Sequence, residues 1–303
     1  MKQTTFIQDA NSVWLKGNVH SHTCCSDGNL TPQQMVDTYA EHGFDWLALT
    51  DHNRFTDPSV LDAGQMILLN GIELTSGWRN RIHINAFWTE GNIFEPDRTI
   101  HLENDAQTKS ILKELRAKGC FLTLNHPHWS LLEPEEVDVT AFDAIEVFNY
   151  STHQFENMGL GTIYWDQMLR RGHYLWGTAG DDNHNGQAPD EQRCDSFGGF
   201  TVVKAKDRSP QAVLEALHQG SFYASGGPQI LDFYIENGIA TVQCSPCTRI
   251  WFCVDGMHRK SKTGRYLTQF SIELRGNEHY IRAECMDVAG HSAYTNPIIL
   301  NNP

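Results

Sequence analysis

The chain has 303 residues, of which 40% are hydrophobic and 11% aromatic, and a formal net charge of −14 at pH 7. This length and composition are typical of a globular protein with one large and one small domain. The negative charge argues against a binder of duplex nucleic acid, which needs a basic surface to release phosphate counterions. It does not exclude phosphorylated substrates, because bound metal ions would reverse the sign of charge locally.

The first ten residues, Met1 to Ala10, lack the apolar core of a signal peptide, and no apolar run is long enough to span a membrane. We therefore expect a cytoplasmic protein that acts on a small molecule, with no membrane partner and with its eight cysteines reduced. Cys244-Ser-Pro-Cys247 is the one Cys-x-x-Cys motif, and without a second pair at metal-binding spacing it is typical of a strand and turn. The oligomeric state does not follow from the sequence.

Strand patterns alternate with amphipathic helix patterns over the first three quarters of the chain. Thr31, Pro32 and Gln34 form a capping signal for a helix that stops at Gly43. The further expected helices cover 106–118, 162–171 and 210–218. The expected strands cover 13–22, 44–50, 67–72, 82–88, 120–124, 144–148, 174–179 and 197–203. Buried parallel strands alternating with helices predict an α/β barrel, in which chemistry takes place at the carboxyl ends of the strands.

After Gly226-Gly227-Pro228 the pattern changes to alternating strands and short turns. Asn237-Gly238 between two of these strands is a strong hairpin signal. The expected strands cover 230–236, 239–244, 249–254, 267–274 and 279–285. We therefore predict a barrel domain over residues 1–227 and a small all-β, sandwich-like domain over residues 228–303. The second domain could cover a pocket or mediate self-association, and the sequence does not distinguish these roles.

Side chains that can bind a metal ion gather at the ends of the predicted strands. His20 and His22 are two residues apart, so on a strand both imidazoles point to the same face, and Asp27 follows where the chain can fold back over that face. The full candidate set is His20, His22, Asp27, His52, Glu73, His83, His126, Asp182 and His184. Each residue alone has an ordinary structural explanation, but nearly all of them lie at strand ends within one domain. Six imidazoles and three carboxylates would overfill one ion, and they suit two or three ions of zinc, manganese or iron.

An ordered set of motifs carries a resemblance to a known family. The motifs are His20-Ser-His22, Ser26-Asp27-Gly28, Thr50-Asp51-His52, Gly71-Ile72-Glu73, Asn125-His126-Pro127 and Asp182-Asn-His184. Over about residues 14–225 the chain resembles the PHP (polymerase and histidinol phosphatase) family of metal-dependent hydrolases. Within that family, the β domain and the ending Ala293-Tyr294-Thr295-Asn296-Pro297-Ile298 resemble the carbaryl-hydrolase-like branch.

The family resemblance implies a distorted (β/α)7 barrel, similar to a TIM barrel, around two or three divalent metal ions. The implied ligand sets are His20, His22, Glu73 and Asp182 for one ion, Glu73, His83 and His126 for a second, and Asp27, His52 and His184 for a third. Asp51 and Asp181 adjoin these ligands, and we expect them to orient imidazoles.

Candidates for substrate contacts lie beside the implied metal ligands. Arg79 and Arg81 precede His83 on the same side of the chain and are candidates for binding phosphate, with a solvated loop as the alternative. His128 is a candidate proton donor, with a structural role as the alternative. Asn149 at a strand end is a candidate substrate contact, whereas we expect Trp129 to lie in the core.

The expected reaction is metal-assisted hydrolysis, in which a water bridging two ions loses a proton and attacks the substrate. The sequence offers no Gly-x-Ser-x-Gly nucleophile elbow. A phosphoesterase for a small phosphorylated metabolite or nucleotide is the leading hypothesis. A carbamate, ester or amide hydrolase is the alternative, and a non-catalytic, metal-stabilised binding module comes third.

Overall fold

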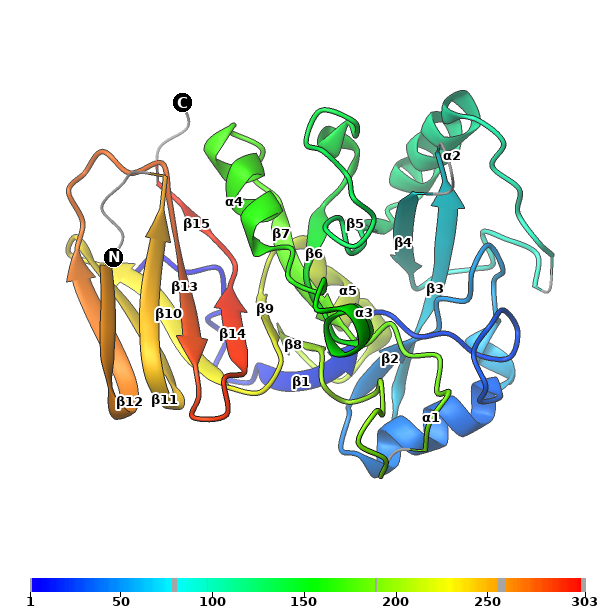
Figure 1. Ribbon diagram of the computed structural model, residues 1–303, viewed down its shortest axis with the longest axis horizontal. Coiled ribbons are helices and arrows are strands. Elements are labelled where there is room, and N and C mark those ends of the chain that lie inside the picture. The colour runs from blue at the N-terminus through cyan, green and yellow to red at the C-terminus, as the bar shows by residue number, and fades with distance from the viewer. Residues whose placement is uncertain (1, 78–80, 97, 189, 256–259, 301–303) are drawn as a thin grey trace.

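The computed structural model describes residues 2–77, 81–96, 98–188, 190–255 and 260–300. Figure 1 shows an α/β part on one side and, on the other, a β part built from the C-terminal strands. The helices are α1 (Pro32–Glu41), α2 (Asp105–Ala117), α3 (Tyr150–Glu156), α4 (Thr162–Arg170) and α5 (Pro210–His218), with short 3₁₀ turns at Pro58–Val60 and Val139–Ala141. The predicted α/β fold with a small C-terminal β part is confirmed.

Helix α1 follows the capping signal read from the sequence. The Thr31 side chain accepts a hydrogen bond from the Gln34 backbone, the Gln34 side chain accepts one from the Thr31 backbone, and Pro32 takes the first helical position. Met35 and Tyr39 lie on the buried face, and Gly43 with φ of 72° follows the helix end. The helix is therefore fixed against the barrel beside the loop that carries Asp27.

The α/β part contains nine strands in the order β9-β8-β1-β2-β3-β4-β5-β6-β7 among the described residues. Their bounds are β1 (Val13–Asn18), β2 (Trp46–Ala48), β3 (Ile67–Ser76), β4 (Ile82–Trp88), β5 (Phe121–Leu124), β6 (Ala144–Asn149), β7 (Trp176–Gly180), β8 (Phe200–Ala205) and β9 (Phe222–Ser225). Thr201 of β8 accepts a hydrogen bond from the Ala179 amide of β7 at 3.1 Å and donates one to the Ala179 carbonyl at 2.9 Å. This contact brings the two ends of the strand order together into a distorted barrel.

The expectation that the barrel strands are parallel is wrong for several of them. β4 runs antiparallel to both β3 and β5, and β8 runs antiparallel to β1 and β9. The link from Ser76 to Ile82 is too short for the crossover that a parallel pair requires, so these strands form a hairpin-like pair. As a result, the N-terminal end of β4 lies beside the C-terminal end of β3, and Thr75 pairs with His83.

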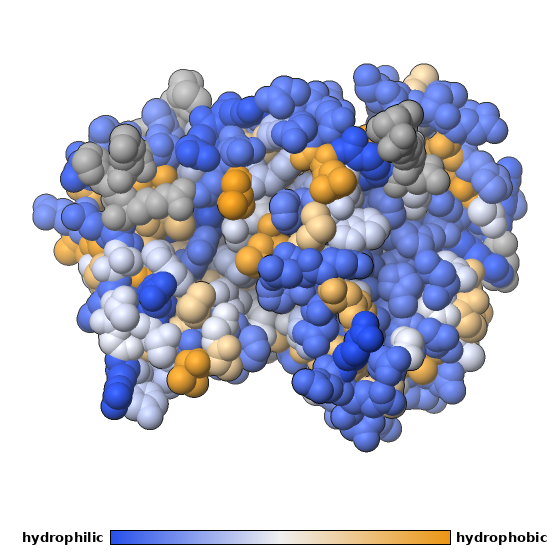
Figure 2. Space-filling model, in the orientation of Figure 1, coloured by the Kyte–Doolittle hydropathy of each residue, from blue (hydrophilic) through white to orange (hydrophobic). Residues whose placement is uncertain are grey.

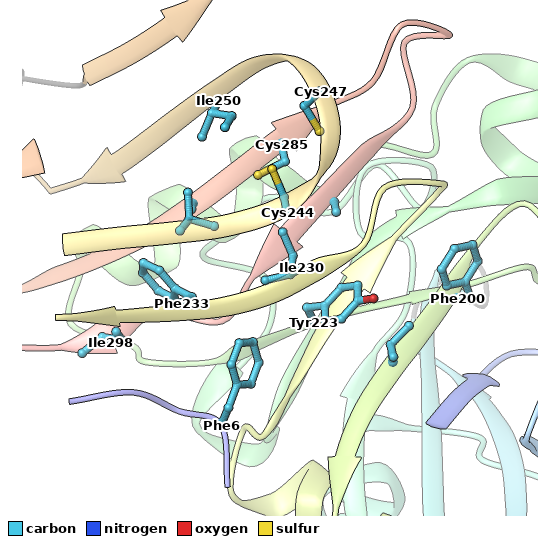
Figure 3. Close-up of a cluster of buried hydrophobic side chains, with 14 of the residues drawn as sticks. Phe6, Phe200, Tyr223, Ile230, Phe233, Cys244, Cys247, Ile250, Cys285 and Ile298 are labelled. Atoms are coloured by element: carbon cyan, nitrogen blue, oxygen red, sulfur yellow. The ribbon is translucent and has the colours of Figure 1, made fainter. Parts of the chain in front are cut away.

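The β part contains β10 (Ile230–Glu236), β11 (Ile239–Val254), β12 (Lys260–Glu273), β13 (Tyr280–Met286), β14 (Ser292–Thr295) and β15 (Ile298–Ile299). The two strands expected over 239–244 and 249–254 are one bent strand, β11. Its pairing with β12 shifts register on both sides of Cys247. Figure 3 shows Cys244, Cys247 and Cys285 near this bend, in an apolar cluster with Phe233. All eight cysteines are free thiols.

The α/β and β parts share backbone and side-chain contacts. β14 pairs with β9, with Tyr294 opposite Ala224. The buried guanidinium of Arg282 on β13 lies 2.5 Å from Asp166 of α4. The division into domains at residue 227 stays a prediction. No helix in the described part of the chain combines the length and apolar character needed to cross a membrane. Figure 2 shows a largely hydrophilic face with scattered hydrophobic residues.

Candidate metal centre

The nine metal-ligand candidates lie at one end of the barrel. His20 and His22 follow β1, His52 follows β2, and Glu73 lies near the end of β3. His83 belongs to the same end because β4 is reversed. His126 follows β5, and Asp182 and His184 follow β7. Every one of the nine belongs to at least one group whose ligand atoms lie within 4.8 Å of one another.

The innermost group contains His20, His22, Glu73 and Asp182, all of them buried. The Asp182 Oδ1 atom lies 3.2 Å from His20 Nε2 and 3.0 Å from His22 Nε2. The Glu73 carboxylate lies 3.3 Å from the same two nitrogens. These four residues are the set that the family resemblance implied for one ion.

A more accessible group contains His22, Asp27, His52 and His184. The Asp27 carboxylate lies 3.7 Å from His22 Nδ1, 3.7 Å from His52 Nε2 and 3.5 Å from His184 Nε2. The side chains of Asp27, His52 and His184 are 53%, 26% and 34% exposed, so the centre opens to solvent on this side. His22 presents a different ring nitrogen to each group and lies between them.

The set implied for the second ion is only partly brought together. His83 Nδ1 lies 3.1 Å from Glu73 Oε1, and these two residues form a close group with His52. His126 Nε2 lies 3.6 Å from Glu73 Oε1, but its close group contains His20 and Glu146. The third side of the centre is therefore arranged differently from the implied ligand set.

Glu146 on β6 is a component of the site that the sequence reasoning missed. One carboxylate oxygen lies 3.0 Å from His20 Nδ1, and the other accepts hydrogen bonds from the His126 backbone amide at 3.0 Å and from Asn149 at 2.9 Å. The signal was present in the sequence as a single ionisable residue within the otherwise apolar strand Ala144–Phe148. A buried carboxylate in that setting needs specific partners.

The donor atoms fit one or more metal ions. His20 Nε2, His22 Nδ1 and Glu73 Oε2 are buried and form no hydrogen bond with a described residue, although charged or ionisable groups surround them. Such atoms are costly to bury unless something binds them. Nitrogen and carboxylate oxygen atoms together suit zinc, manganese or iron. His126 and Asp182 also have left-handed backbones, with φ of 25° and 55°, a strain that is concentrated at functional sites.

The electrostatics of the centre also favour cations. Burial alone would raise the pKa of Asp182, but His20, His22 and His126 outweigh it and hold this pKa well below its usual value. Burial alone would likewise raise the pKa of Glu73, which His52, His20 and His83 hold well below its usual value. Both carboxylates are therefore ionised at the centre, as a metal ligand must be.

Contrary to expectation, the carboxylates of Asp51 and Asp181 bind groups other than imidazoles within the described residues. Asp51 accepts hydrogen bonds from the Thr23 amide at 2.7 Å, from Ser26 Oγ at 2.9 Å and from Thr56 Oγ1 at 2.7 Å. It therefore holds the loop that carries Asp27. Asp181 accepts bonds from the Tyr39 hydroxyl and from the backbone amides of residues 197–199, and so fixes the segment after β7.

The candidates for substrate contact are arranged differently from expectation. Arg79 lies outside the described residues. Arg81 donates to the Ser130 carbonyl at 2.9 Å and pairs with Glu136, so its guanidinium is held by the 130–136 segment. Asn149 donates to Asp182 Oδ2 at 3.1 Å and to Glu146, so it supports the carboxylates.

Two further residues with predicted roles, His128 and Trp129, lie in the turn after β5. His128 is exposed, and it belongs to none of the close groups found among the described residues. Trp129 was expected in the core, but it is 38% exposed and its ring lies beside His126.

A barrel whose strand ends gather six imidazoles and three carboxylates defines a metal-binding α/β protein. The PHP domain model matches residues 17–120, a segment that contains the first six of the nine candidates. Residues 17–120 are therefore similar to the PHP domain, the domain of metal-dependent hydrolases that the motif order indicated. The likeness to the carbaryl-hydrolase-like branch stays a prediction.

One curated relative and two solved structures are similar to the chain. The 5′-3′ exoribonuclease Rnm of Escherichia coli is 37% identical over 76 residues, which cover 22% of this chain and 25% of Rnm. The chain thus matches about a quarter of the length of that relative. A two-domain protein from Bacteroides vulgatus, described as containing a PHP-like metal-dependent phosphoesterase, is 18% identical, covers 98% of both chains and has a TM-score of 0.54. A protein from Bifidobacterium adolescentis, described as a putative metal-dependent phosphoesterase, is 17% identical with a TM-score of 0.42, covering 58% of this chain and 90% of its own.

Proposed function

We propose that the chain is a metal-dependent phosphoesterase that hydrolyses a small phosphorylated metabolite or a nucleotide. The observation that carries the proposal is the gathering of nine metal-ligand candidates into close groups, which are linked by shared members and contain buried donor atoms without a hydrogen bond. The shared members are His20, His22, His52 and Glu73. The match of residues 17–120 to the PHP domain model supports it. A cytoplasmic location is part of the proposal.

The residues of the innermost group would hold one ion, and Asp27, His52 and His184 would hold another with the help of His22. When bound, such ions activate water and neutralise charge on a phosphate oxygen. Glu73 would serve more than one ion, because it belongs to two groups and its two oxygens face different imidazoles. We further propose that a third ion binds on the side of the centre where His83 and His126 lie.

The protein residues determine where the substrate enters. The innermost group is buried, whereas Asp27, His52 and His184 are partly exposed, so a substrate reaches the centre from their side. Asp51 fixes the Asp27 loop through Thr23 and Ser26, so this side is ordered before a substrate binds. An ordered site with fixed polar groups reduces the reorganisation that the reaction requires.

Metal analysis and a substrate panel test the proposal. Purified protein should contain more than one equivalent of zinc, manganese or iron, and it should release phosphate from phosphomonoesters without cleaving aryl esters or carbamates. The reverse selectivity would replace the proposal by a carbamate, ester or amide hydrolase. Full activity with a single equivalent of metal would contradict the shared cluster. Protein that is loaded with metal but inert on both classes would indicate a binding module.

His52→Ala and Asp182→Ala test the more accessible group and the innermost group of the centre, respectively. Each change should abolish phosphate release while leaving the circular dichroism spectrum unchanged, because each removes a donor from a different close group. Exposed His279→Ala on the β part is the matched control, since His279 pairs with Asp255 away from the centre. A near-normal rate in either site variant would remove that residue from the proposed centre.

A further inference from the structure

An exposed indole stands beside the candidate metal centre. Trp129 lies three residues after His126 in the turn that follows β5. Its ring centroid lies 5.0 Å from that of His126 and 6.1 Å from that of His83. Both imidazoles belong to the close groups around the centre. His83 in turn contacts His52 on the solvent-open side, with ring centroids 5.5 Å apart. Trp129 therefore borders the centre on the side of His83 and His126, and His83 links it to His52.

The two imidazoles meet the indole edge to face. The interplanar angles are 82° with His126 and 83° with His83, so neither ring stacks on Trp129. Across the described residues, no other aromatic ring stacks parallel to this indole. An aromatic ring without a stacked partner, on a residue that is 38% exposed, can stack on a planar ligand.

The turn that carries Trp129 is held in place by hydrogen bonds. The Ser130 amide donates to the His126 carbonyl at 3.0 Å, and the Ser130 hydroxyl lies 3.0 Å from His126 Nδ1. Arg81 Nε donates to the Ser130 carbonyl at 2.9 Å. The turn that presents the indole is thus fixed before a ligand arrives, and a fixed backbone loses less freedom on binding.

The charged groups near Trp129 favour stacking, rather than ion pairing, as the way in which the protein binds the part of the substrate beyond its phosphate. The guanidinium of Arg81 pairs with Glu136 and the Ser130 carbonyl, so its charge is used within the protein. Metal ions would bind the phosphate, and a flat apolar surface next to them suits a ring attached to that phosphate. Stacking of a base on an aromatic side chain is worth about 1–3 kcal/mol, or roughly 5-fold to 150-fold in affinity.

We propose that Trp129 is the specificity-determining residue of the site, and that its indole stacks on a planar ring carried by the phosphorylated substrate. This inference rests on the proposed phosphoesterase function. It selects, among phosphorylated small molecules, those with an aromatic or heteroaromatic ring close to the phosphate.

Matched pairs of phosphomonoesters test the proposal on the metal-loaded full chain. The pairs are adenosine 5′-monophosphate with ribose 5-phosphate, and phenyl phosphate with ethyl phosphate, which differ by the ring. Wild-type protein should show a KM for each ring compound about 10-fold or more below that of its partner. Trp129→Ala and Trp129→Leu should remove this advantage without changing KM for the compounds that lack a ring, and Trp129→Phe should retain most of it.

Two controls separate recognition from structural damage. Metal content and the circular dichroism spectrum should be unchanged in the Trp129 variants. Tyr266→Ala, which removes an exposed aromatic side chain of β12, should leave both pairs unaffected. If the protein does not hydrolyse the two compounds of a pair, calorimetry measures a Kd for each compound. The two Kd values then test stacking on Trp129 without turnover.

Each outcome decides the proposal. A wild-type protein without a ring advantage, or an advantage that survives Trp129→Ala, overturns it. An equal loss for both members of a pair also overturns it, because that result assigns Trp129 to packing around His126. Failure of the proposed function is seen separately, as metal-loaded wild-type protein that hydrolyses no phosphomonoester.

Discussion

Glu146 Oε1 lies 3.0 Å from His20 Nδ1, and both side chains are buried. The carboxylate fixes His20 with a proton on Nδ1, which leaves Nε2 free to face Asp182 and Glu73. The second Glu146 oxygen holds the His126 backbone amide, so one side chain positions two imidazoles. Carboxylates that orient metal-binding histidines typically change metal affinity 10-fold to 100-fold when they are removed.

We therefore expect Glu146→Ala to lower the metal affinity of the centre by about 10-fold or more. Glu146→Gln should lose less, because an amide oxygen can still accept a hydrogen bond from His20 Nδ1. Chelator competition with metal analysis measures the affinity. An unchanged affinity in Glu146→Ala would show that His20 is oriented without this carboxylate.

Gly180 allows the close approach of β7 to His20. A Cβ atom at this position would lie 2.7 Å from His20 Cβ and 2.9 Å from Glu146 Oε1. Gly180→Ala should therefore displace the His20 imidazole and destabilise the fold by about 1–3 kcal/mol. Urea unfolding and metal content measure these effects.

Gly186→Ala is the matched control for this substitution. No described atom lies within 4 Å of the added Cβ, and the residue follows the same strand. This variant should retain both the stability and the metal content of the wild type. Equal behaviour of the two variants would mean that the barrel adjusts around Gly180.

The solvent-open side of the centre should lose its ion independently of the innermost group. Asp27→Ala removes the one carboxylate shared by His52 and His184, whereas His20 and Glu73 keep their partners. Metal content should fall by about one equivalent, and the remainder should stay bound on dialysis. Asp37→Ala on the exposed face of α1 serves as the control. Loss of all metal in Asp27→Ala would show that the groups bind only together.

Asp166 and Arg282 connect α4 to the β part through a buried ion pair. Removing one partner of such a pair costs about 3–5 kcal/mol, because a charge remains buried without its counterpart. Asp166→Ala should reduce the free energy of unfolding by about this amount or somewhat less, because Glu284 still pairs with the buried Arg282 in the variant. Urea unfolding monitored by fluorescence measures it. Glu135→Ala, which breaks the exposed pair with Arg171, should have little effect.

The sequence could predict the metal centre because its residues sit at the ends of apolar strands. Strand ends in one barrel meet in space, so the nine candidates could be collected without knowing any distance. His83 was included although it begins its strand, and the reversal of β4 is what brings it to Glu73. Glu146 was passed over because it lies within a strand, where side-chain direction depends on register.

Other features depend on contacts that no local pattern encodes. The contacts of the Arg81 guanidinium with Ser130 and Glu136, far along the chain, could not be predicted from the residues around it. The exposure of Trp129 depends on how a short turn closes against His126. Residues 245–248 resemble a turn in the sequence, but they form a bend at Cys247 within the single strand β11.

The pairing of β9 with β14 has a consequence for synthesis of the protein. β9 is paired with β8 on one side, and its other edge is covered by residues 292–295, which leave the ribosome after the rest of the barrel. Until they arrive, the barrel carries an open strand edge, which is a template for pairing with another chain. A chain whose synthesis ends early, within the β part, would therefore contain a barrel prone to edge-to-edge aggregation, even if the candidate metal ligands were already in place.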